Sequence, residues 1–260
     1  MQITPPFGYR EIVPLQQQMA VRLPTPGELP PFAAQTNAVP MSYTEFAPAS
    51  RDYPIVFTSG DGKTFTAVAV TGTAPGENLF VRDGRWDAQA YVPAYVRRHP
   101  FCMARMQMDN VGQPQRLVCL EKSAVVESGG ERLFDDAGKP SERWGPLERF
   151  INEYEADLER TREMCALLAE YKLLEPFALQ AKLPAGELSL NGMARVDERR
   201  LAALDEQQLR DLLGKGILGR IYVHLVSLEN FPRLLARKAG VQTAQPASER
   251  QAAPAPAPVD

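Results

Sequence analysis

The segment from Tyr91 to Phe101 holds the side chains best suited to binding an anion. Its sequence is Tyr-Val-Pro-Ala-Tyr-Val-Arg-Arg-His-Pro-Phe. Adjacent arginines supply planar donor forks that match a carboxylate or phosphate, and nearby aromatic rings add rigid contact area. We predict a ligand- or partner-binding surface made of Tyr91, Tyr95, Arg97, Arg98 and His99. The alternative is that the tyrosines and Phe101 are core residues while the arginines pair with an acidic helix face.

Acid–base catalysis has few candidate residues in this chain. Histidine occurs only at His99 and His224. His224 lies on the apolar stripe of a predicted helix, one turn before Leu228, where it would act as a base if a pocket opened there. The commoner explanation is a buried histidine whose ring is hydrogen-bonded to a backbone carbonyl.

Asp157 is a further acid–base candidate, one turn after Glu153 and close to Arg160. Two carboxylates in different environments can divide the acid and base roles. Residues 153–163 alternate in charge, however, which is typical of a solvated or salt-bridged helix face.

Two classes of function follow from these residues. An enzyme, or an accessory subunit of one, would gather at least three of its candidates in one deep pocket. Those candidates are Arg97, Arg98, His99, Asp157 and His224. If they are separated or face solvent, the better interpretation is a non-enzymatic binding or assembly protein, whose expected partner is a protein or an anionic small molecule.

The sequence contains no motif for a metal or cofactor, and none is expected. The histidines do not form a zinc-binding pair, and neither a nucleophile elbow nor a dinucleotide fingerprint is present. The segment from Ser59 to Thr64 ends like a phosphate-binding loop, but Phe57 stands where the leading glycine is required. The cysteines, Cys102, Cys119 and Cys165, are too widely separated for a disulfide framework and are expected as reduced core thiols.

Charge and hydropathy restrict the partners further. The formal net charge of −3 gives no basic field, so a nucleic-acid partner is not expected. The N-terminus lacks the basic region and apolar run of a secretory signal, and no apolar stretch approaches the roughly 18 residues of a membrane span. Cytoplasmic residence without a membrane span is therefore expected.

The hydrophobic periodicity of the sequence predicts the elements that position these residues. Together they form an expected α+β fold, with an antiparallel β-rich N-terminal half and an amphipathic-helix-rich C-terminal half packed on it. Strands are expected at 55–58 and 64–70, joined by an Asp-Gly turn, and at 78–81, 101–108 and 116–121, all in one antiparallel sheet. A long amphipathic helix follows Trp144, with Leu158 at the centre of its apolar stripe. Two more strands are expected at 173–182 and 187–196. Helices follow, one capped by Asp205 and one starting at Ile217, with a kink or restart at Pro232.

Proline content sets the expected domain boundaries. Prolines crowd residues 1–53, which predicts an extended arm over the core. Residues 54–240 are the expected α+β domain. Residues 241–260 are rich in Ala and Pro and cannot bury enough apolar area to fold, so a disordered tail is expected.

Several blocks of sequence resemble the bacterial SapC family. In the first half they are residues 78–81, 86–87 and 91–101, and in the second half 150–163, 173–177, 190–198 and 221–230. The resemblance extends from about Tyr9 to Lys238. The family name implies a cell-envelope or surface-layer context, and with it association with the cell surface, but neither an established activity nor catalytic residues.

Overall fold

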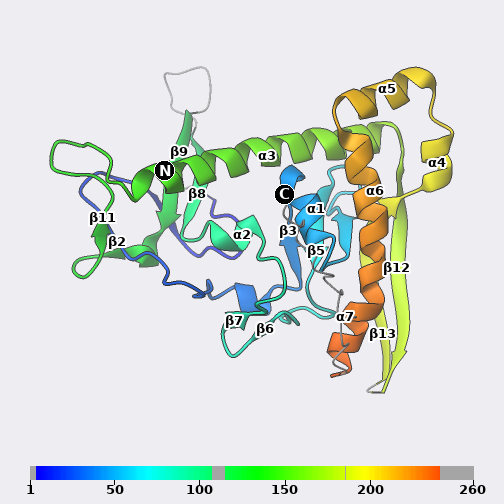
Figure 1. Ribbon diagram of the computed structural model, residues 1–260, viewed down its shortest axis with the longest axis horizontal. Coiled ribbons are helices and arrows are strands. Elements are labelled where there is room, and N and C mark those ends of the chain that lie inside the picture. Colours follow the sequence, from blue (N-terminus) through cyan, green and yellow to red (C-terminus); the bar gives the residue numbers. More distant parts are fainter. Residues whose placement is uncertain (1–3, 107–114, 185, 241–260) are drawn as a thin grey trace, which may run out of the picture.

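The computed structural model describes residues 4–106, 115–184 and 186–240. They form an α+β fold, as predicted, with antiparallel sheets drawn mainly from the first half of the chain and helices mainly from the second (Figure 1). The tail expected at 241–260 lies outside the described residues.

Helix α3 (Trp144–Glu170) runs along the long axis of the molecule and joins its two hydrophobic cores (Figure 1). Its first turns place Trp144 and Ile151 in a small core beneath the short strands. Its later turns place Met164 and Leu168 in the main core, which confirms the predicted amphipathic helix. Leu158 is not the centre of the stripe, because it is half-buried and borders a cavity.

The main sheet has five strands in the order β12-β13-β4-β5-β3, and all neighbours are antiparallel. In that order the strands are Leu174–Leu183, Gly186–Val196, Ile55–Thr58, Thr66–Val70 and Ala38–Pro40. The predicted β4–β5 hairpin is confirmed, and the two strands expected at 173–182 and 187–196 are present as β12 and β13, which pair with each other. Because β13 pairs with β4 through Met193 and Ala194, strands from the two halves of the chain share one sheet.

The other described strands form smaller sheets, so the prediction of one sheet in the first half is wrong. One sheet has the order β1-β9-β8, with strands Ile12–Pro14, Gln115–Glu121 and Phe101–Met106. Another has the order β10-β2-β11, with strands Val125–Val126, Ala20–Val21 and Glu131–Arg132. β1, β2 and β3 contain only two or three residues each and lie among prolines. They pair with β9, with β10 and β11, and with β5, so none of them joins β8–β9 to β4–β5.

The strand expected at 78–81 is also corrected. Only Val81–Arg82 (β6) is extended, and it pairs with Arg85–Trp86 (β7). The Asn78 side chain donates to the carbonyl of Ala33 at 2.7 Å and accepts from the N–H of Phe80 at 3.0 Å. These side-chain bonds to the backbone hold residues 78–80 in place of a strand ladder.

The proline-rich segment is extended over much of its length and contributes directly to the fold. Its strands β1, β2 and β3 all pair with strands that follow residue 53. Met41, Phe46 and Tyr53 from this segment are at most 1% exposed. The division of the chain at residue 53 stays a prediction.

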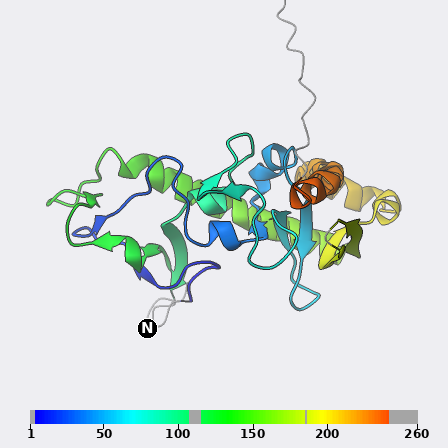
Figure 2. The same ribbon diagram turned by 90° about the horizontal axis from the view of Figure 1, so that it is seen from below.

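Short helices flank the sheets. They are α1 (Phe46–Ala49), α2 (Ala94–Arg97), α4 (Glu198–Ala202), α5 (Glu206–Gly214), α6 (Ile217–Ser227) and α7 (Phe231–Lys238), with 3-10 turns η1 (Ala33–Gln35), η2 (Tyr43–Glu45), η3 (Lys122–Ala124) and η4 (Leu228–Asn230). The capping of α5 by Asp205 and the restart at Pro232 are confirmed. α4, capped by Asp197, was not anticipated. Figure 2 shows α6 and α7 beside the β12–β13 hairpin.

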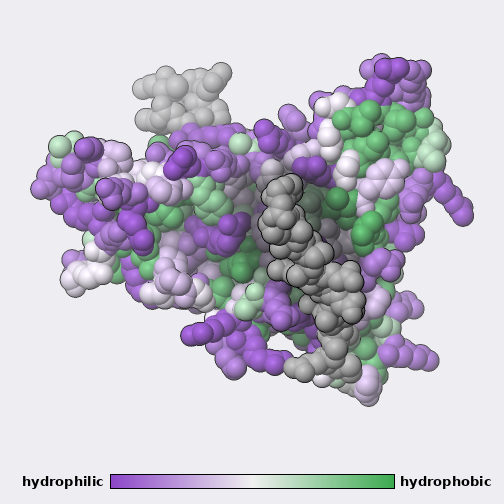
Figure 3. All heavy atoms as spheres, in the orientation of Figure 1, coloured by the Kyte–Doolittle hydropathy of each residue, from purple (hydrophilic) through white to green (hydrophobic). Residues whose placement is uncertain are grey.

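Apolar side chains gather on the surface over α5 and α6 (Figure 3). Its exposed apolar side chains are Leu209, Leu213, Tyr222 and Val226. Across the described ranges, no helix combines the length and apolar character needed to cross a bilayer.

Candidate ligand-binding cavity beside Arg98

Glu45 fixes the start of α2 and with it the direction of the arginines that follow. The side chain is 3% exposed. Its Oε1 accepts from the N–H of Ala94 at 2.5 Å and from the hydroxyl of Tyr91 at 3.0 Å. Its Oε2 accepts from the N–H and hydroxyl of Ser42 at 3.0 and 2.7 Å. One carboxylate therefore ties α2 to the η2 turn.

Arg98 follows α2 and is buried, with 5% of its surface exposed. Its Nη1 lies 3.2 Å from Oε1 of Glu155 on α3. Its guanidinium carbon lies 4.4, 5.0 and 5.7 Å from the ring centroids of Tyr95, Tyr154 and Tyr9. Ring faces stabilise a cation, and a desolvated cation most of all. One ion pair and three rings thus hold the buried charge.

The hydrogen bonds around Arg98 are incomplete. The hydroxyls of Tyr9 and Tyr95 donate to the carbonyls of Phe101 and Phe7. The hydroxyl of Tyr154 and Nε of Arg98 are buried without a partner. In the described part of the chain, one other buried side-chain N or O atom lacks a hydrogen-bond partner, the hydroxyl oxygen of Ser141. Two of the three unpartnered atoms therefore lie in one place.

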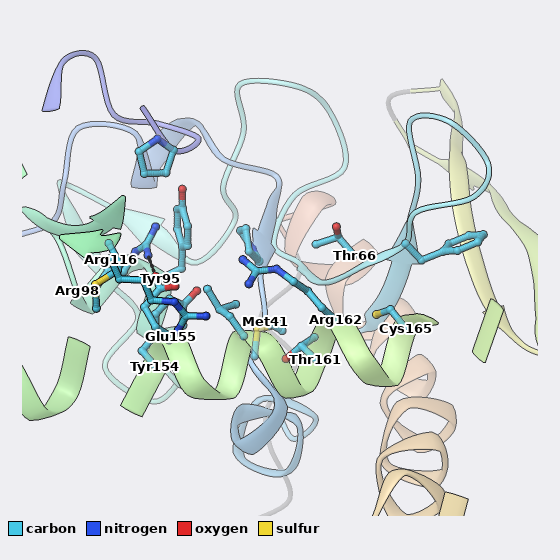
Figure 4. A pocket seen from close by; sticks show the side chains of 15 residues that line it. Met41, Thr66, Tyr95, Arg98, Arg116, Tyr154, Glu155, Thr161, Arg162 and Cys165 are labelled. Carbon is cyan, nitrogen blue, oxygen red and sulfur yellow. Dashed lines mark hydrogen bonds and ion pairs between the residues drawn. The ribbon is translucent and has the colours of Figure 1, made fainter. Parts of the chain in front are cut away.

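Arg98 and Tyr154 both line a cavity of about 370 Å³ above α3, which we call the α3 cavity (Figure 4). A volume of this size suits a small organic molecule. α3 forms its floor with Tyr154, Glu155, Leu158, Thr161, Arg162 and Cys165. The remaining walls come from residues distant in sequence: Pro6, Pro40, Met41, Phe65, Thr66, Tyr95, Arg98, Met103 and Arg116.

The rim of the cavity is positively charged. Arg116 of β9 and Arg162 of α3 both line it, and their side chains are 45% and 56% exposed. Both pair with Glu159, at 2.7 and 3.0 Å. Among the lining residues and these ion-pair partners, three arginines face two glutamates, which leaves one surplus positive charge.

Burial determines the protonation of the cavity groups. It raises the pKa of Tyr154 well above its ordinary value, so this phenol stays a neutral O–H donor. It raises the pKa of the Cys165 thiol to about 12, so no thiolate nucleophile forms. Burial also raises the pKa of Glu155, and the neighbouring Arg98 offsets part of that effect. The cavity thus offers donors and positive charge rather than a reactive base.

Arg97 and Tyr91 lie outside this cavity. Arg97 is exposed; its Nε donates to the carbonyl of Val92 at 2.9 Å and its Nη2 to the hydroxyl of Tyr91 at 3.0 Å. Its guanidinium carbon is 5.1 Å from the ring centroid of Phe150. The adjacent arginines thus have different surroundings. Of the predicted contact residues, only Tyr95 and Arg98 line the α3 cavity, and both are buried.

A second hollow, of about 380 Å³, is lined by Arg97, Arg98 and His99 together. His99 is half-buried and lies 5.4 and 6.0 Å from the ring centroids of Tyr9 and Phe32. Burial lowers its pKa. A peptide bond in the cis form joins His99 to Pro100.

His224 and Asp157 lie apart from these residues. The ring of His224 is fully buried; Nδ1 donates to the carbonyl of Ile55 at 2.7 Å and Nε2 accepts from the N–H of Val196 at 3.1 Å. The interpretation as a buried histidine bonded to backbone is confirmed. Asp157 accepts from the hydroxyl of Thr44 and pairs with Arg160 at 3.3 Å, so it is salt-bridged, as the charge pattern indicated.

The loop that resembled a phosphate-binding loop is the turn of the β4–β5 hairpin. Asp61 Oδ1 accepts from the N–H groups of Lys63 and Thr64 at 2.8 and 2.7 Å. The backbone donors that a phosphate would need are therefore bonded to this carboxylate. Within the described ranges, no group of three or more His, Cys, Asp or Glu side chains is placed to hold a metal ion.

Sequence reasoning missed most of the cavity. Tyr154, Thr161 and Cys165 belong to the apolar stripe of α3, and polar groups on such a stripe are the signal that could have found them. Arg116 and Arg162 carried no signal, because exposed arginines are common on any surface.

Fold and cavity together define an α+β protein with a buried arginine at the end of a ligand-sized cavity. A family model described as SapC matches residues 22–234, and the chain belongs to the SapC family. Searches of curated proteins and of solved structures returned no match.

Proposed function

We propose that this SapC-family protein is a non-enzymatic binding protein that holds an anionic ligand in the α3 cavity. The observation that carries the proposal is that Arg98 and Tyr154, which both line one cavity, each hold a buried donor without a partner, Arg98 Nε–H and Tyr154 O–H. A buried donor without an acceptor costs about 1–3 kcal/mol. Both donor atoms are covered in this structure, so a ligand oxygen would bond to them once Arg98 and Tyr154 turn toward the cavity, and it would then remove this cost for both.

The electrostatics of the cavity support an anion. Arg98 is always charged, and Arg116 and Arg162 add positive charge at the rim. Glu155 and Glu159 neutralise part of this charge but not all of it. A negatively charged ligand would therefore complement the charge of the cavity.

The surroundings of the acid–base candidates favour binding over catalysis. Arg97, Arg98 and His99 do share the second hollow, which is the arrangement an enzyme would need. A guanidinium, however, cannot exchange protons near neutral pH, so His99 has no acid–base partner from this set. His224 and Asp157 are bonded elsewhere, His224 to backbone and Asp157 to Thr44 and Arg160.

The family name adds a cellular context to this proposal. It implies a link to the bacterial cell envelope or surface layer, where a binding protein could act in assembly. Fractionation of native cells with an antibody to the protein tests that context. Recovery with envelope proteins supports it, and recovery only in the unassociated cytosolic fraction contradicts it.

The binding proposal is tested with tyrosine variants that each remove one hydroxyl. Tyr154→Phe removes an unpartnered hydroxyl, so stability should stay unchanged or rise while ligand retention falls. Tyr95→Phe is the matched control, since its hydroxyl is already bonded to the Phe7 carbonyl and its loss should cost about 1 kcal/mol. Arg97→Gln, outside the cavity, should keep the ligand.

Two measurements decide the outcome. Native mass spectrometry of protein purified from its own cells detects a retained ligand, and thermal denaturation ranks the variants. A retained anionic mass that Tyr154→Phe loses and Arg97→Gln keeps supports the proposal. The absence of any retained or added anion on the wild-type chain overturns it. Equal losses of stability in Tyr154→Phe and Tyr95→Phe would show that the Tyr154 hydroxyl is structural.

A further inference from the structure

The cavity is chemically different at its two ends. Arg98, Tyr95 and Tyr154 lie at one end, and Cys165 and Thr66 lie at the other, where α3 meets the start of β5 (Figure 4). From Tyr154 to Cys165 the helix rises about 16 Å at 1.5 Å per residue. The cavity is therefore elongated along α3, with its buried donors at one end.

Apolar surface connects the two ends. Leu158 follows Tyr154 by one turn of α3, Phe65 precedes Thr66 in the chain, and Met41 lies between the two ends (Figure 4). Each of them lines the cavity, and Phe65 and Leu158 remain partly accessible. An alkyl chain or similar apolar body along this path would remove that surface from water.

The charges near Arg98 and Tyr154 determine which acidic group of a ligand can bind at that end of the cavity. Arg98 is already paired with Glu155, so the positive charge available to a ligand is that of the rim arginines, Arg116 and Arg162, which both pair with Glu159. A phosphate dianion would bring two negative charges beside a buried glutamate, whereas a carboxylate brings one. A carboxylate also has two oxygens, one for each of the two unpartnered donors.

Resting on the proposed function, we propose that the ligand is an elongated monocarboxylic acid. Its carboxylate accepts from Arg98 and Tyr154, and its apolar chain follows α3 toward Cys165 and Thr66. No covalent step is involved.

Calorimetric titration with a graded series of probes tests this class of ligand. The probes are acetate, butanoate, octanoate, dodecanoate, octan-1-ol and inorganic phosphate. Affinity should rise about fourfold for each methylene that enters the cavity, which corresponds to about 0.8 kcal/mol. Octanoate should bind at least about tenfold tighter than octan-1-ol, because the alcohol lacks the charged head.

Two variants locate the head and the chain separately. Tyr154→Phe should weaken all the acids by a similar factor, because it changes only the head site. Thr66→Trp fills the far end from an exposed strand position, so it should weaken dodecanoate while butanoate is unaffected. Thr58→Trp is the matched control, since Thr58 is the cross-strand partner of Thr66 and does not line the cavity.

The outcomes separate this inference from the proposed function. Phosphate or acetate binding as tightly as dodecanoate would overturn the elongated acid and leave anion binding intact. Equal weakening of short and long acids by Thr66→Trp would overturn the placement of the chain. Failure of every anion to bind would overturn the proposed function itself.

Discussion

Replacing Glu45 by glutamine tests whether one carboxylate holds the arginine segment in place. Its two oxygens accept four hydrogen bonds, two of them from the backbone N–H groups of Ser42 and Ala94. Glutamine keeps the shape but exchanges one oxygen for an NH2 group, which accepts nothing. Because each oxygen serves one of these backbone donors, either orientation of the amide leaves one backbone N–H without an acceptor.

The expected cost follows from these bonds. A buried donor without a partner costs about 1–3 kcal/mol, and a bond to a charged acceptor is worth about 1 kcal/mol more than one to a neutral acceptor. We therefore expect Glu45→Gln to lower the free energy of unfolding by about 3 kcal/mol. Ser42→Ala removes one hydroxyl donor and leaves the carboxylate with three others, so it should cost only about 1 kcal/mol.

Urea denaturation followed by tryptophan fluorescence measures both variants, since Trp86 and Trp144 are buried and report unfolding. The same variants should differ in melting temperature by several degrees, because about 1 kcal/mol shifts a domain of this size by roughly 2–4 °C. A Glu45→Gln protein within about 0.5 kcal/mol of wild type, which is the range of neutral surface changes, would refute the assignment of Glu45 as the clamp of α2.

Three further predictions concern the core and the chain end. Burial lowers the pKa of His224 from 6.5 to about 4, so the stability it contributes is present above pH 6.5 and is lost as the pH falls toward 4. The His224→Gln variant should show a flatter stability profile across this window, and parallel profiles would contradict the prediction. Leu168→Ala should lower the free energy of unfolding in urea by about 3 kcal/mol, because Leu168 is fully buried. Leu158→Ala should lower it clearly less, because Leu158 borders the cavity, and similar losses would argue against this placement of α3. Ending the chain at about Gly240 should leave the melting temperature unchanged on compositional grounds, and a drop of several degrees would show that the removed residues pack.

Local sequence signals predicted the local structure well. The Asp-Gly turn between 55–58 and 64–70 was predictable because Asp61 accepts the turn N–H groups and Gly62 adopts a φ of +69°. The long helix followed from its apolar period, and α5 from the capping residue Asp205. In each case the determining contacts lie within a few residues of one another.

Sheet organisation and the cavity depended on contacts that no local pattern encodes. β13 joins β4 across more than a hundred residues, and the first-half strands separate into small sheets because their partners are distant. The cavity likewise combines Pro6, Met41, Arg98 and Arg116 with the stripe of α3. The sequence identified the stripe, but its polar residues could not be assigned to a cavity without the residues that form the other walls.

The Arg-Arg pair shows why adjacent residues need separate tests. Consecutive residues on a helical turn point about 100° apart, since 3.6 residues complete one turn. Arg97 consequently extends over Phe150 at the surface, while Arg98 enters the interior beside Glu155 and Tyr154. A double substitution would combine a surface change with the loss of a buried charge whose partner, Glu155, would remain behind. Single Arg97→Gln and Arg98→Gln variants separate these effects, and on our proposal only the Arg98 variant loses the ligand.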